Sequence, residues 1–492
     1  MNIRHLLTAS AVALLAGIGA ARAEGSITIG MQLEPPNLDP TGGAAEAIDS
    51  VVYANIFQGL TRFTSDGSVV ANLADSWDIS ADGLVYTFQL HPGVTFHDGS
   101  AMDAEDVKFS LDRARAEGST NAQKALFAEI ADVTVVDPTT VRVTLAAPNG
   151  NLLFNLAWGD AVIVAPETAD TNATNPIGTG PYTFVNWVQG DRINLARNEA
   201  YWGTAPALET ASFRFISDPT AALAAVMAED IDVFSGFPAP ENLPQIAADP
   251  RFQVITGSTE GETILAMNNK LPPFDNAKVR EAVSHAIDRQ AIIDGAMFGY
   301  GTPIGTHFAP HNPAYVDLTA ASGHDPELAK KLLAEAGLAD GFTTTLKLPP
   351  PSYARRGGEI VAAQLAAVGI RTEIENLEWA QWLEQVFKAR DFGLTIVSHT
   401  EPMDIGIYGN PDYYFQYDNQ AFRDVMAKLT GTTDPAARTA LLQEAQGIIA
   451  ADHVNGYLFQ LAALTVAKAG VRGLWANAPV AANDLSAISW AE

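Results

Sequence analysis

Short runs of alternating apolar and polar residues characterise the first part of the chain, and this pattern predicts strands. The predicted strands are Ser26–Gly30, Val85–Leu90, the pair Val133–Val136 and Val141–Leu145, and two strands within Phe184–Arg197. The turn sequence Asp137-Pro138-Thr139-Thr140 separates the pair and predicts a β-hairpin. The apolar residues of Tyr53–Thr61 have helical spacing instead, so we expect a mixed α+β unit up to about Tyr182.

Helical spacing of apolar residues is more frequent in the later part of the chain, where it alternates with strands. The predicted helices are Pro219–Ala228, Asn276 to about Gly295, Asp325–Gly337, Glu359–Val368 and a segment containing Trp379, Trp382, Leu383 and Val386; the predicted strands are Arg371–Glu375 and Gly393–Val397. Asn276 and Asp325 are good N-cap residues, and Glu327 and Lys331 are spaced to pair on one helix face. This alternation predicts α/β layers with a parallel component, and the polar segment Met267–Pro273 is a candidate linker between two domains.

The start of the chain has the pattern of a secretory signal. Arg4 and His5 precede an apolar run from Leu6 to Ala20, and Ala21-Arg22-Ala23 follows it. The run is short for a membrane anchor, and the chain has no cysteine to acylate. We therefore expect residues 1–23 to be a cleaved signal peptide and the mature protein to be periplasmic.

The net charge of the chain limits the kinds of partner that we expect. The formal charge is −28 at pH 7, and a surface of this sign repels phosphate backbones, so we expect no nucleic-acid partner. The absence of cysteine excludes disulfides, zinc–thiolate sites and thiol nucleophiles. A strongly acidic exported body also fits a soluble monomer.

Catalytic motifs are missing from the sequence. It contains no G-x-S-x-G, no H-E-x-x-H and no P-loop, and no cofactor is predicted. His307 and His311 stand four residues apart, but the surrounding prolines place them in a loop, which makes them a weak metal pair. His399 lies near Glu401 and Asp404, and these three residues could bind a cation.

The segment after the predicted strand Gly393–Val397 is the strongest candidate for ligand contact. Ligands of α/β proteins bind at strand ends, and the two acids Glu401 and Asp404 could pair there with an ammonium group. Tyr408 and the tyrosines after it could form pocket walls, although a solvated loop would explain the same residues. Arg355 and Arg356, in a proline-rich loop entering a helix, could bind a carboxylate or could be surface charge.

Eight motifs, in a fixed order over nearly the whole mature chain, resemble those of the peptide- and nickel-binding family of extracellular solute-binding proteins of ABC transporters, which includes dipeptide and oligopeptide receptors. They are Leu38–Pro40 (LDP), Leu73–Trp77 (LADSW), Val94–Gly99 (VTFHDG), Asp106–Ser110 (DVKFS), Gly178–Tyr182 (GTGPY), Arg197-Asn198 with Tyr201-Trp202, Val279-Arg280 with Ala286–Arg289 (AIDR), and Ala329–Gly337 (AKKLLAEAG). The resemblance implies an α/β, two-lobed periplasmic binding protein fold of type II with an extra α+β subdomain in the first lobe. The implied boundaries are 24–266 for the first lobe, with the subdomain at about 53–175, 267–465 for the second lobe, and 466–492 for the return to the first lobe.

The resemblance also implies where the ligand is held. In peptide receptors of this family an aspartate of the second lobe binds the peptide ammonium, and Asp404, then Glu401, are the matching candidates, although Val397-Ser398-His399 departs from the usual family sequence there. Glu34 and one of Arg355 or Arg356 match further peptide contacts. The complete predicted set of ligand contacts is Asp404, Glu401, His399, Glu34, Arg355, Arg356, Trp382 and Tyr408.

We therefore predict a substrate-binding component of an ABC importer, with a short peptide or peptide-like solute and the membrane permease as partners. A receptor for an opine, an amino-acid conjugate, an oligosaccharide or a nickel complex is the alternative, and a secreted hydrolase is less favoured.

Overall fold

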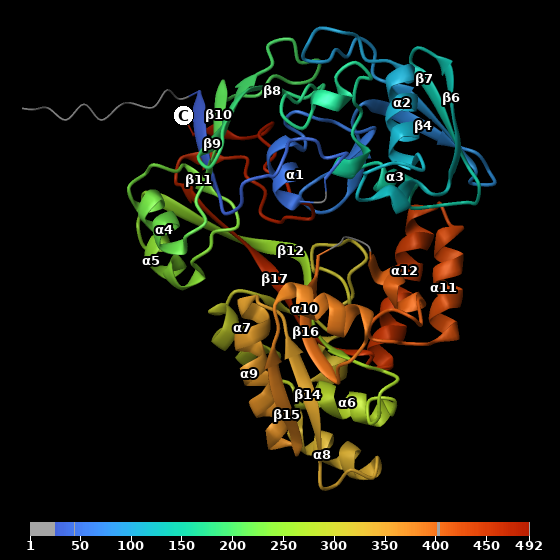
Figure 1. Ribbon diagram of the computed structural model, residues 1–492, viewed down its shortest axis with the longest axis vertical. Coiled ribbons are helices and arrows are strands. Elements are labelled where there is room, and N and C mark those ends of the chain that lie inside the picture. Colours follow the sequence, from blue (N-terminus) through green and yellow to red (C-terminus); the bar gives the residue numbers. More distant parts are fainter. Residues whose placement is uncertain (1–24, 44, 401–403, 492) are drawn as a thin grey trace, which may run out of the picture.

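The computed structural model describes residues 25–43, 45–400 and 404–491, and Figure 1 shows two lobes, one above the other. The predicted signal peptide and Glu401 lie outside the described residues. Among these residues, no helix combines the length and the apolar character that a membrane span requires.

A long mixed sheet runs through both lobes. Its strand order is β15 (Ile370–Asn376), β14 (Phe342–Leu348), β16 (Leu394–His399), β12 (Phe252–Met267), β17 (Asn455–Lys468), β11 (Val233–Phe234), β1 (Ser26–Met31), β10 (Thr210–Phe215), β9 (Arg192–Arg197) and β8 (Tyr182–Val188), and β13 (Thr302–Pro303) pairs with β17. β1 is parallel to β10 and β11, and β14 is parallel to β15 and β16. The predicted parallel component is therefore confirmed.

The antiparallel strands β12 and β17 connect the two lobes (Figure 1). Phe252 of β12 and Val466 of β17 pack in one apolar cluster with α4 (Pro219–Met227) and α5 (Leu243–Ala247). At their other ends, Leu265 and Leu458 pack in the core of the second lobe. The pairing shifts register between Ser258 and Glu262, so the ladder is irregular between the lobes.

The first lobe contains a second, separate core. The four-stranded antiparallel sheet is β4 (Ala74–Ile79), β5 (Val85–Leu90), β7 (Thr140–Leu145) and β6 (Ile130–Asp137), and α2 (Ala104–Arg115) packs on it. Phe88, Val107 and Val143 are fully buried in this core. The predicted hairpin is β6–β7, and the extra α+β subdomain is present. The remaining elements of this lobe are α1 (Glu46–Val52), α3 (Leu152–Asn155), the strand pairs β2 (Thr61–Phe63)–β3 (Val69–Ala71) and β18 (Val471–Arg472)–β19 (Ser489–Trp490), and the 3-10 turns η1 (Lys124–Phe127), η2 (Gly159–Ala161), η3 (Ala169–Thr171) and η4 (Pro240–Asn242).

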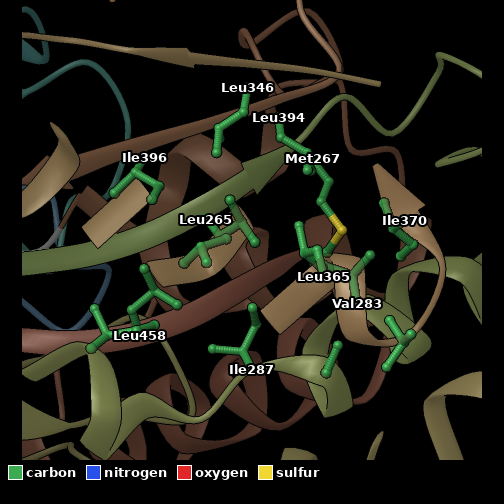
Figure 2. Close-up of a cluster of buried hydrophobic side chains, with 14 of the residues drawn as sticks. Leu265, Met267, Val283, Ile287, Leu346, Leu365, Ile370, Leu394, Ile396 and Leu458 are labelled. Atoms are coloured by element: carbon green, nitrogen blue, oxygen red, sulfur yellow. The ribbon is translucent and has the colours of Figure 1, made fainter. Parts of the chain in front are cut away.

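Helices cover the sheet in the second lobe. Figure 2 shows Leu346 and Leu394 of the strands facing Val283 and Leu365 of the helices, all of them fully buried. The helices are α6 (Ala277–Ala286), α7 (Arg289–Met297), α8 (Pro326–Glu335), α9 (Ser352–Ala367), α10 (Trp379–Trp382), the π-helix η6 (Leu383–Lys388), α11 (Gln420–Thr430) and α12 (Pro435–Ala451), with the 3-10 turns η5 (Thr319–Ser322) and η7 (Asp404–Gly409). Burial of these apolar side chains is the main favourable contribution to folding of the lobe.

Several predicted helices differ from those observed. The helix predicted from Asn276 to Gly295 is two helices, because Asp288 caps a new helix by accepting a hydrogen bond from Ala291 N at 3.1 Å. Residues 53–60 form turns and bridges rather than a helix, and Thr61 begins β2. The predicted Glu327–Lys331 pair is absent among the described ion pairs, because Lys330 binds Glu327 and Lys331 lies 3.9 Å from Glu335.

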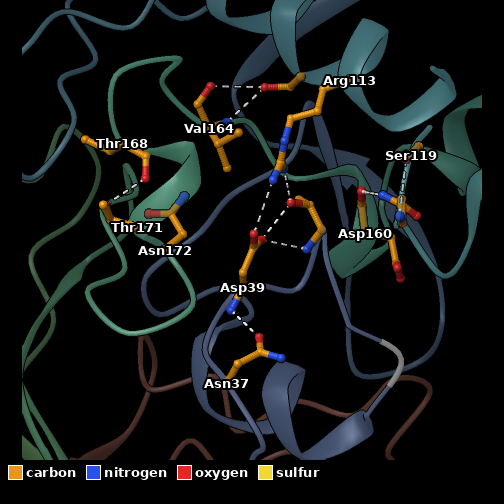
Figure 3. Close-up of polar contacts among 12 residues, drawn as sticks. Asn37, Asp39, Arg113, Ser119, Asp160, Val164, Thr168, Thr171 and Asn172 are labelled. Atoms are coloured by element: carbon orange, nitrogen blue, oxygen red, sulfur yellow. Dashed lines mark hydrogen bonds and ion pairs between the residues drawn. The ribbon is translucent and has the colours of Figure 1, made fainter. Parts of the chain in front are cut away.

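The family-like motif Leu38–Pro40 has a structural role. Asp39 Oδ1 accepts hydrogen bonds from Thr41 N and Thr41 Oγ1 at 2.9 and 2.6 Å. Asn37 Oδ1 accepts a hydrogen bond from Asp39 N (Figure 3). Arg113 of α2 donates to Thr41 Oγ1 at 2.5 Å and lies 3.5 Å from Asp39 Oδ2. These bonds fix the loop after β1 to the subdomain, next to the segment that begins α1.

The lobes also touch away from the two connecting strands. Gly150 N of the first lobe donates to Thr430 O of α11 at 3.0 Å, and the Arg438 side chain of α12 donates to Asn151 Oδ1. The same guanidinium donates to Leu429 O and Thr432 O at 2.9 and 2.8 Å. This contact joins the α11–α12 turn to the residues in front of α3.

Candidate functional site

A cavity of about 250 Å³ lies where the lobes meet the connecting strands. The first lobe contributes residues of α1 and of the segment before η2, β12 contributes Thr259–Gly261, β17 contributes Leu461, and Thr400 follows β16 of the second lobe. The lining residues are Glu46, Asp49, Tyr53, Trp158, Gly159, Thr259, Glu260, Gly261, Thr400, Leu461 and Ala478–Ala481. A site built from both lobes changes its shape whenever the lobes move.

Three buried polar atoms of this lining have no hydrogen-bond partner among the described residues. They are Asp49 Oδ1, Trp158 Nε1 and Glu260 Oε2. Buried polar groups are nearly always paired in folded proteins, and an unpaired one costs about 1–3 kcal/mol. The residues around one cavity therefore carry two acceptors and one donor without a partner among the described residues.

Glu260 is held in place by a short chain of hydrogen bonds. The residue is 5% exposed, and its Oε1 lies 2.5 Å from His311 Nε2. The other ring nitrogen, Nδ1, lies 2.5 Å from Ser258 Oγ. Ser258 and Glu260 are two residues apart on β12, so both side chains lie on the same face of the strand. The pairing of β12 with β17 is irregular in this segment.

Asp49 is electrostatically unfavourable as a carboxylate. Burial raises its pKa well above the usual value, and the nearby charges of Asp160 and Glu46 raise it further. Burial also raises the pKa of Asp160 to about 6. Gly159 makes the position of Asp49 possible, because a Cβ atom there would lie 2.1 Å from Asp49 Oδ1. A cation in the cavity would relieve this accumulation of acidic groups.

The segment after β18 closes one side of the cavity. Ala478 N donates to Ser258 O at 2.9 Å, and Asn483 is bound to both Asn55 and Ser50 by hydrogen bonds of 2.8 Å. A second cavity of about 290 Å³ shares the residues Glu46, Ala478, Val480 and Ala481 with the first. The two cavities therefore adjoin, and together they offer space for a ligand larger than a single ion.

A buried network in the second lobe contains three of the predicted contacts. His307 Nε2 lies 2.5 Å from Asp404 Oδ1, and His399 Nδ1 lies 3.2 Å from Asp404 Oδ2. Tyr408 OH lies 3.2 Å from His307 Nδ1, and Tyr414 OH lies 3.1 Å from His399 Nε2. The structure thus brings His399 next to Asp404, as the sequence predicted, and places Tyr408 in the same network. Both oxygens of Asp404 already have partners.

Two residues of this network, together with Glu262 of β12, have the donor chemistry of a metal site. One ligand atom from each of Glu262, His307 and Asp404 lies within 4.8 Å of the others. His307 and His311, which the sequence placed in a loop as a weak metal pair, have different partners: His307 contacts Asp404, whereas His311 contacts Glu260. The predicted cation cluster of His399, Glu401 and Asp404 includes a residue outside the described ones.

Comparison with known proteins identifies the chain. Residues 68–421 match the model of the bacterial extracellular solute-binding proteins, family 5. The chain belongs to this family. Relatives include the glutathione-binding protein GsiB of Pectobacterium atrosepticum, 34% identical over 71% of this chain and 69% of that protein, and GsiB of Salmonella paratyphi A, 32% identical over 84% of each. The predicted family is therefore confirmed, and the chain is the solute-binding component of an ABC importer.

Solved structures of similar proteins confirm the two-lobed fold. HbpA2 of Haemophilus parasuis superposes with a TM-score of 0.85 at 25% identity, covering 95% of this chain and 100% of that one. DppA of Helicobacter pylori in complex with the peptide STSA has a TM-score of 0.76 at 25% identity, with 95% and 98% covered. AgaA of A. tumefaciens R10, in complex with agropinic acid, gives the same TM-score and identity, with 95% and 99% covered.

The other predicted contacts of this solute-binding protein lie apart from the cavity lining. Glu34 Oε1 accepts hydrogen bonds from Trp187 Nε1 and Gly190 N at 2.8 and 2.9 Å. Arg355 pairs with Glu378 at 3.1 Å, and the Arg356 guanidinium lies 5.4 Å from the centre of the Phe298 ring. Both arginines belong to α9, because that helix begins earlier than the predicted Glu359.

Trp382 and Tyr408 are 4% and 0% exposed and pack in the same apolar cluster. The Trp382 Nε1 atom donates to Thr395 Oγ1 at 2.9 Å. These side chains pack inside the second lobe and are not among the residues that line the 250 Å³ cavity. Their contact with a ligand stays a prediction.

Sequence reasoning missed Asp49, Trp158 and Glu260. One signal was present for Glu260, since two glutamates and a glycine interrupt the otherwise apolar end of β12. A polar interruption of a buried strand is a reason to expect a site. Asp49 and Trp158 carried no comparable signal, because acids in the first turns of helices and single tryptophans are common in ordinary surfaces and cores.

Proposed function

We propose that this chain captures a short peptide or a peptide-like solute between its two lobes and passes it, chemically unchanged, to the permease of an ABC importer. The cavity between the lobes carries this proposal, because the residues that line it include two acceptors and one donor without partners among the described residues. A peptide offers complementary donors and acceptors at its ammonium, amide and carbonyl groups.

The relatives support a peptide over other solutes. The matched curated proteins are named as glutathione-binding, and glutathione is a peptide-like molecule. One structural relative holds the peptide STSA. Another holds agropinic acid, so an amino-acid conjugate of this kind is the second candidate ligand class.

Further features of the proposal follow from the sequence. We propose cleavage after Ala23, a periplasmic mature protein, a monomeric state, and lobe boundaries at 24–266, 267–465 and 466–492. The chain performs no chemistry on its ligand. Closure of the lobes would replace water around the ligand with fixed dipoles and charges, as in other hinged binding proteins.

The predicted ligand contacts stay part of the proposal. On the second lobe they are Asp404, Glu401, His399, Trp382, Tyr408, Arg355 and Arg356, and on the first lobe Glu34. Hinge closure could bring exposed members of this set toward the cavity, and substitution of each to alanine tests its contribution to affinity.

A ligand screen tests the function. The mature protein, stripped of bound solute by unfolding and refolding, is mixed with glutathione, dipeptides, tripeptides, agropinic acid or a nickel–histidine complex, and its Tm is measured. A tightly bound ligand raises Tm, because binding to the folded state stabilises it by about 2.7 kcal/mol at a concentration of 100 Kd. A shift with peptides supports the proposal. A shift only with agropinic acid or nickel–histidine, or a hydrolysed ligand in the mass spectrum, contradicts it.

A further inference from the structure

The acidic residues around the cavity between the lobes indicate which part of a ligand it receives. We propose that Glu260 and Asp49 together bind the ammonium group at the amino end of a peptide, while Trp158 Nε1 donates to the carbonyl oxygen next to it. This inference rests on the proposed peptide function and names the end of the peptide that the cavity holds.

Glu260 is the fixed part of this site. His311 occupies one carboxylate oxygen at 2.5 Å, and the side chain is 5% exposed, so the second oxygen has a defined position in the cavity lining. That second oxygen, Oε2, has no donor among the described residues. A buried acceptor of this kind is retained at a cost to stability, and an ammonium N–H would satisfy it with a strong, charge-assisted hydrogen bond.

Asp49 is the part of the site whose protonation should change when a ligand binds. Burial raises the pKa of its carboxyl group, and the charges of Asp160 and Glu46 raise it further. Tyr53 and Glu260 line the same cavity. An ammonium ion near Asp49 favours the carboxylate, so ligand binding would release a proton. Affinity for a free-amine ligand should therefore rise as pH increases toward the raised pKa of Asp49.

The remaining lining distinguishes an ammonium group from other ligands. The cavity of about 250 Å³ is far larger than a metal ion, and its acidic residues would repel a carboxylate. The aromatic residues Tyr53 and Trp158 also line it, and aromatic faces attract ammonium groups. The lone N–H donor of Trp158 requires an acceptor on the ligand, which a simple amine lacks and an aminoacyl group has.

Asp404, the residue that family resemblance suggests for the ammonium, has a different environment. Both of its oxygens are within hydrogen-bonding distance of histidines, at 2.5 and 3.2 Å. An incoming ammonium group would have to displace or compete with these contacts. Glu260 and Asp49 each keep an oxygen without a donor among the described residues, so the ammonium is better placed there.

Calorimetric titration of matched ligands tests this assignment. The probes are glutathione and Ala-Ala-Ala, their N-acetyl forms, and 1,4-diaminobutane as an amine without a carbonyl group. The proteins are the mature wild type, Glu260→Gln, Asp49→Asn, Trp158→Phe and the control Glu335→Gln, whose exposed carboxylate pairs with Lys278. Glutamine keeps an acceptor for His311, and the Tm of each variant reports whether it folds.

We expect the wild type to bind free-amine peptides at least about 30-fold more tightly than their N-acetyl forms, because acetylation removes the charge from a buried pair. Glu260→Gln and Asp49→Asn should reduce that preference to about threefold or less, and Glu335→Gln should leave it unchanged. Trp158→Phe should weaken peptide binding but not binding of 1,4-diaminobutane. Equal binding of free and acetylated peptides, or full preference in Glu260→Gln, overturns the inference.

The same titrations separate the inference from the peptide function. If no peptide binds but 1,4-diaminobutane binds in a Glu260-dependent way, the peptide function fails and the ammonium site stands. If peptides bind without the amine preference, the function stands and the ammonium site fails. If neither kind of ligand binds, both are wrong.

Discussion

His307 Nε2 lies 2.5 Å from Asp404 Oδ1, and this contact connects the loop after β13 to the turn after β16 inside the second lobe. Burial acts to raise the pKa of Asp404, but the charge of His307 and the hydrogen bonds from His307 and His399 outweigh it and lower the pKa well below the usual value. The contact therefore stabilises the folded lobe when Asp404 is ionised.

Substituting Asp404 with asparagine should lower the free energy of unfolding by about 1.5–3 kcal/mol at pH 7, the range for hydrogen bonds to a charged group. Because the pKa is lower in the folded than in the unfolded chain, this stabilisation is present above about pH 4 and is lost as pH falls further. Urea unfolding at pH 7 and at pH 3 should thus show the difference between wild type and Asp404→Asn shrinking in acid. The exposed-site control Asp340→Asn should differ little from wild type at either pH, and an unchanged gap would contradict the account.

Asp49→Asn should raise the stability of the ligand-free protein at pH 7. The folded-state pKa of Asp49 lies above the unfolded value, so wild-type stability declines as pH rises from about 4 through the folded value. Asparagine removes this decline, because it carries no charge to repel Asp160 and Glu46. Thermal unfolding at pH 5 and pH 8 measures the effect. A variant less stable than wild type at pH 8 would show that the Asp49 carboxylate is not under strain.

Gly159→Ala should destabilise the protein by about 1–3 kcal/mol, because the new Cβ atom would lie 2.1 Å from Asp49 Oδ1 and force a shift. It should also weaken ligand binding, since Asp49 lines the cavity. Gly447→Ala in α12 is the matched control, because no heavy atom lies within 4 Å of its added Cβ. That change should stabilise by about 0.5–1 kcal/mol. Equal effects of the two substitutions on stability would refute the close approach at Gly159.

Arg438 and Asn151 should be energetically coupled across the lobes. A double-mutant cycle of Arg438→Ala and Asn151→Ala, measured by urea unfolding, should give a coupling energy of about 0.5–3 kcal/mol. Arg438→Ala alone should be the more destabilising change, because it also leaves Leu429 O and Thr432 O without this donor. Strict additivity of the two substitutions would show that the contact contributes nothing to the joining of the lobes.

Periodicity and capping residues allowed much of the fold to be predicted, since these signals act within a few residues. The β6–β7 hairpin, the caps at Asn276 and Asp325 and the strand β16 follow directly from local sequence. The break at Asp288 was missed because the apolar stripe continues on both sides of it. A single cap residue ended one helix and began another there.

The cavity could not be predicted in the same way. Asp49 and Trp158 come from separate segments of the first lobe and Glu260 comes from β12, and packing between these distant segments brings the three residues to one cavity. The motifs that carried the family resemblance include Leu38–Pro40, whose aspartate serves to fix a loop. Motifs therefore predicted the scaffold, whereas the chemistry of the binding cavity depends on long-range packing.

Native mass spectrometry of the mature protein, before and after addition of glutathione or Ala-Ala-Ala, tests the central claim most directly. We predict a one-to-one complex whose ligand, once released, has an unchanged mass, and a Glu260→Gln variant that retains little of it. A protein that stays ligand-free with both peptides, or that releases a cleaved product, would contradict the account.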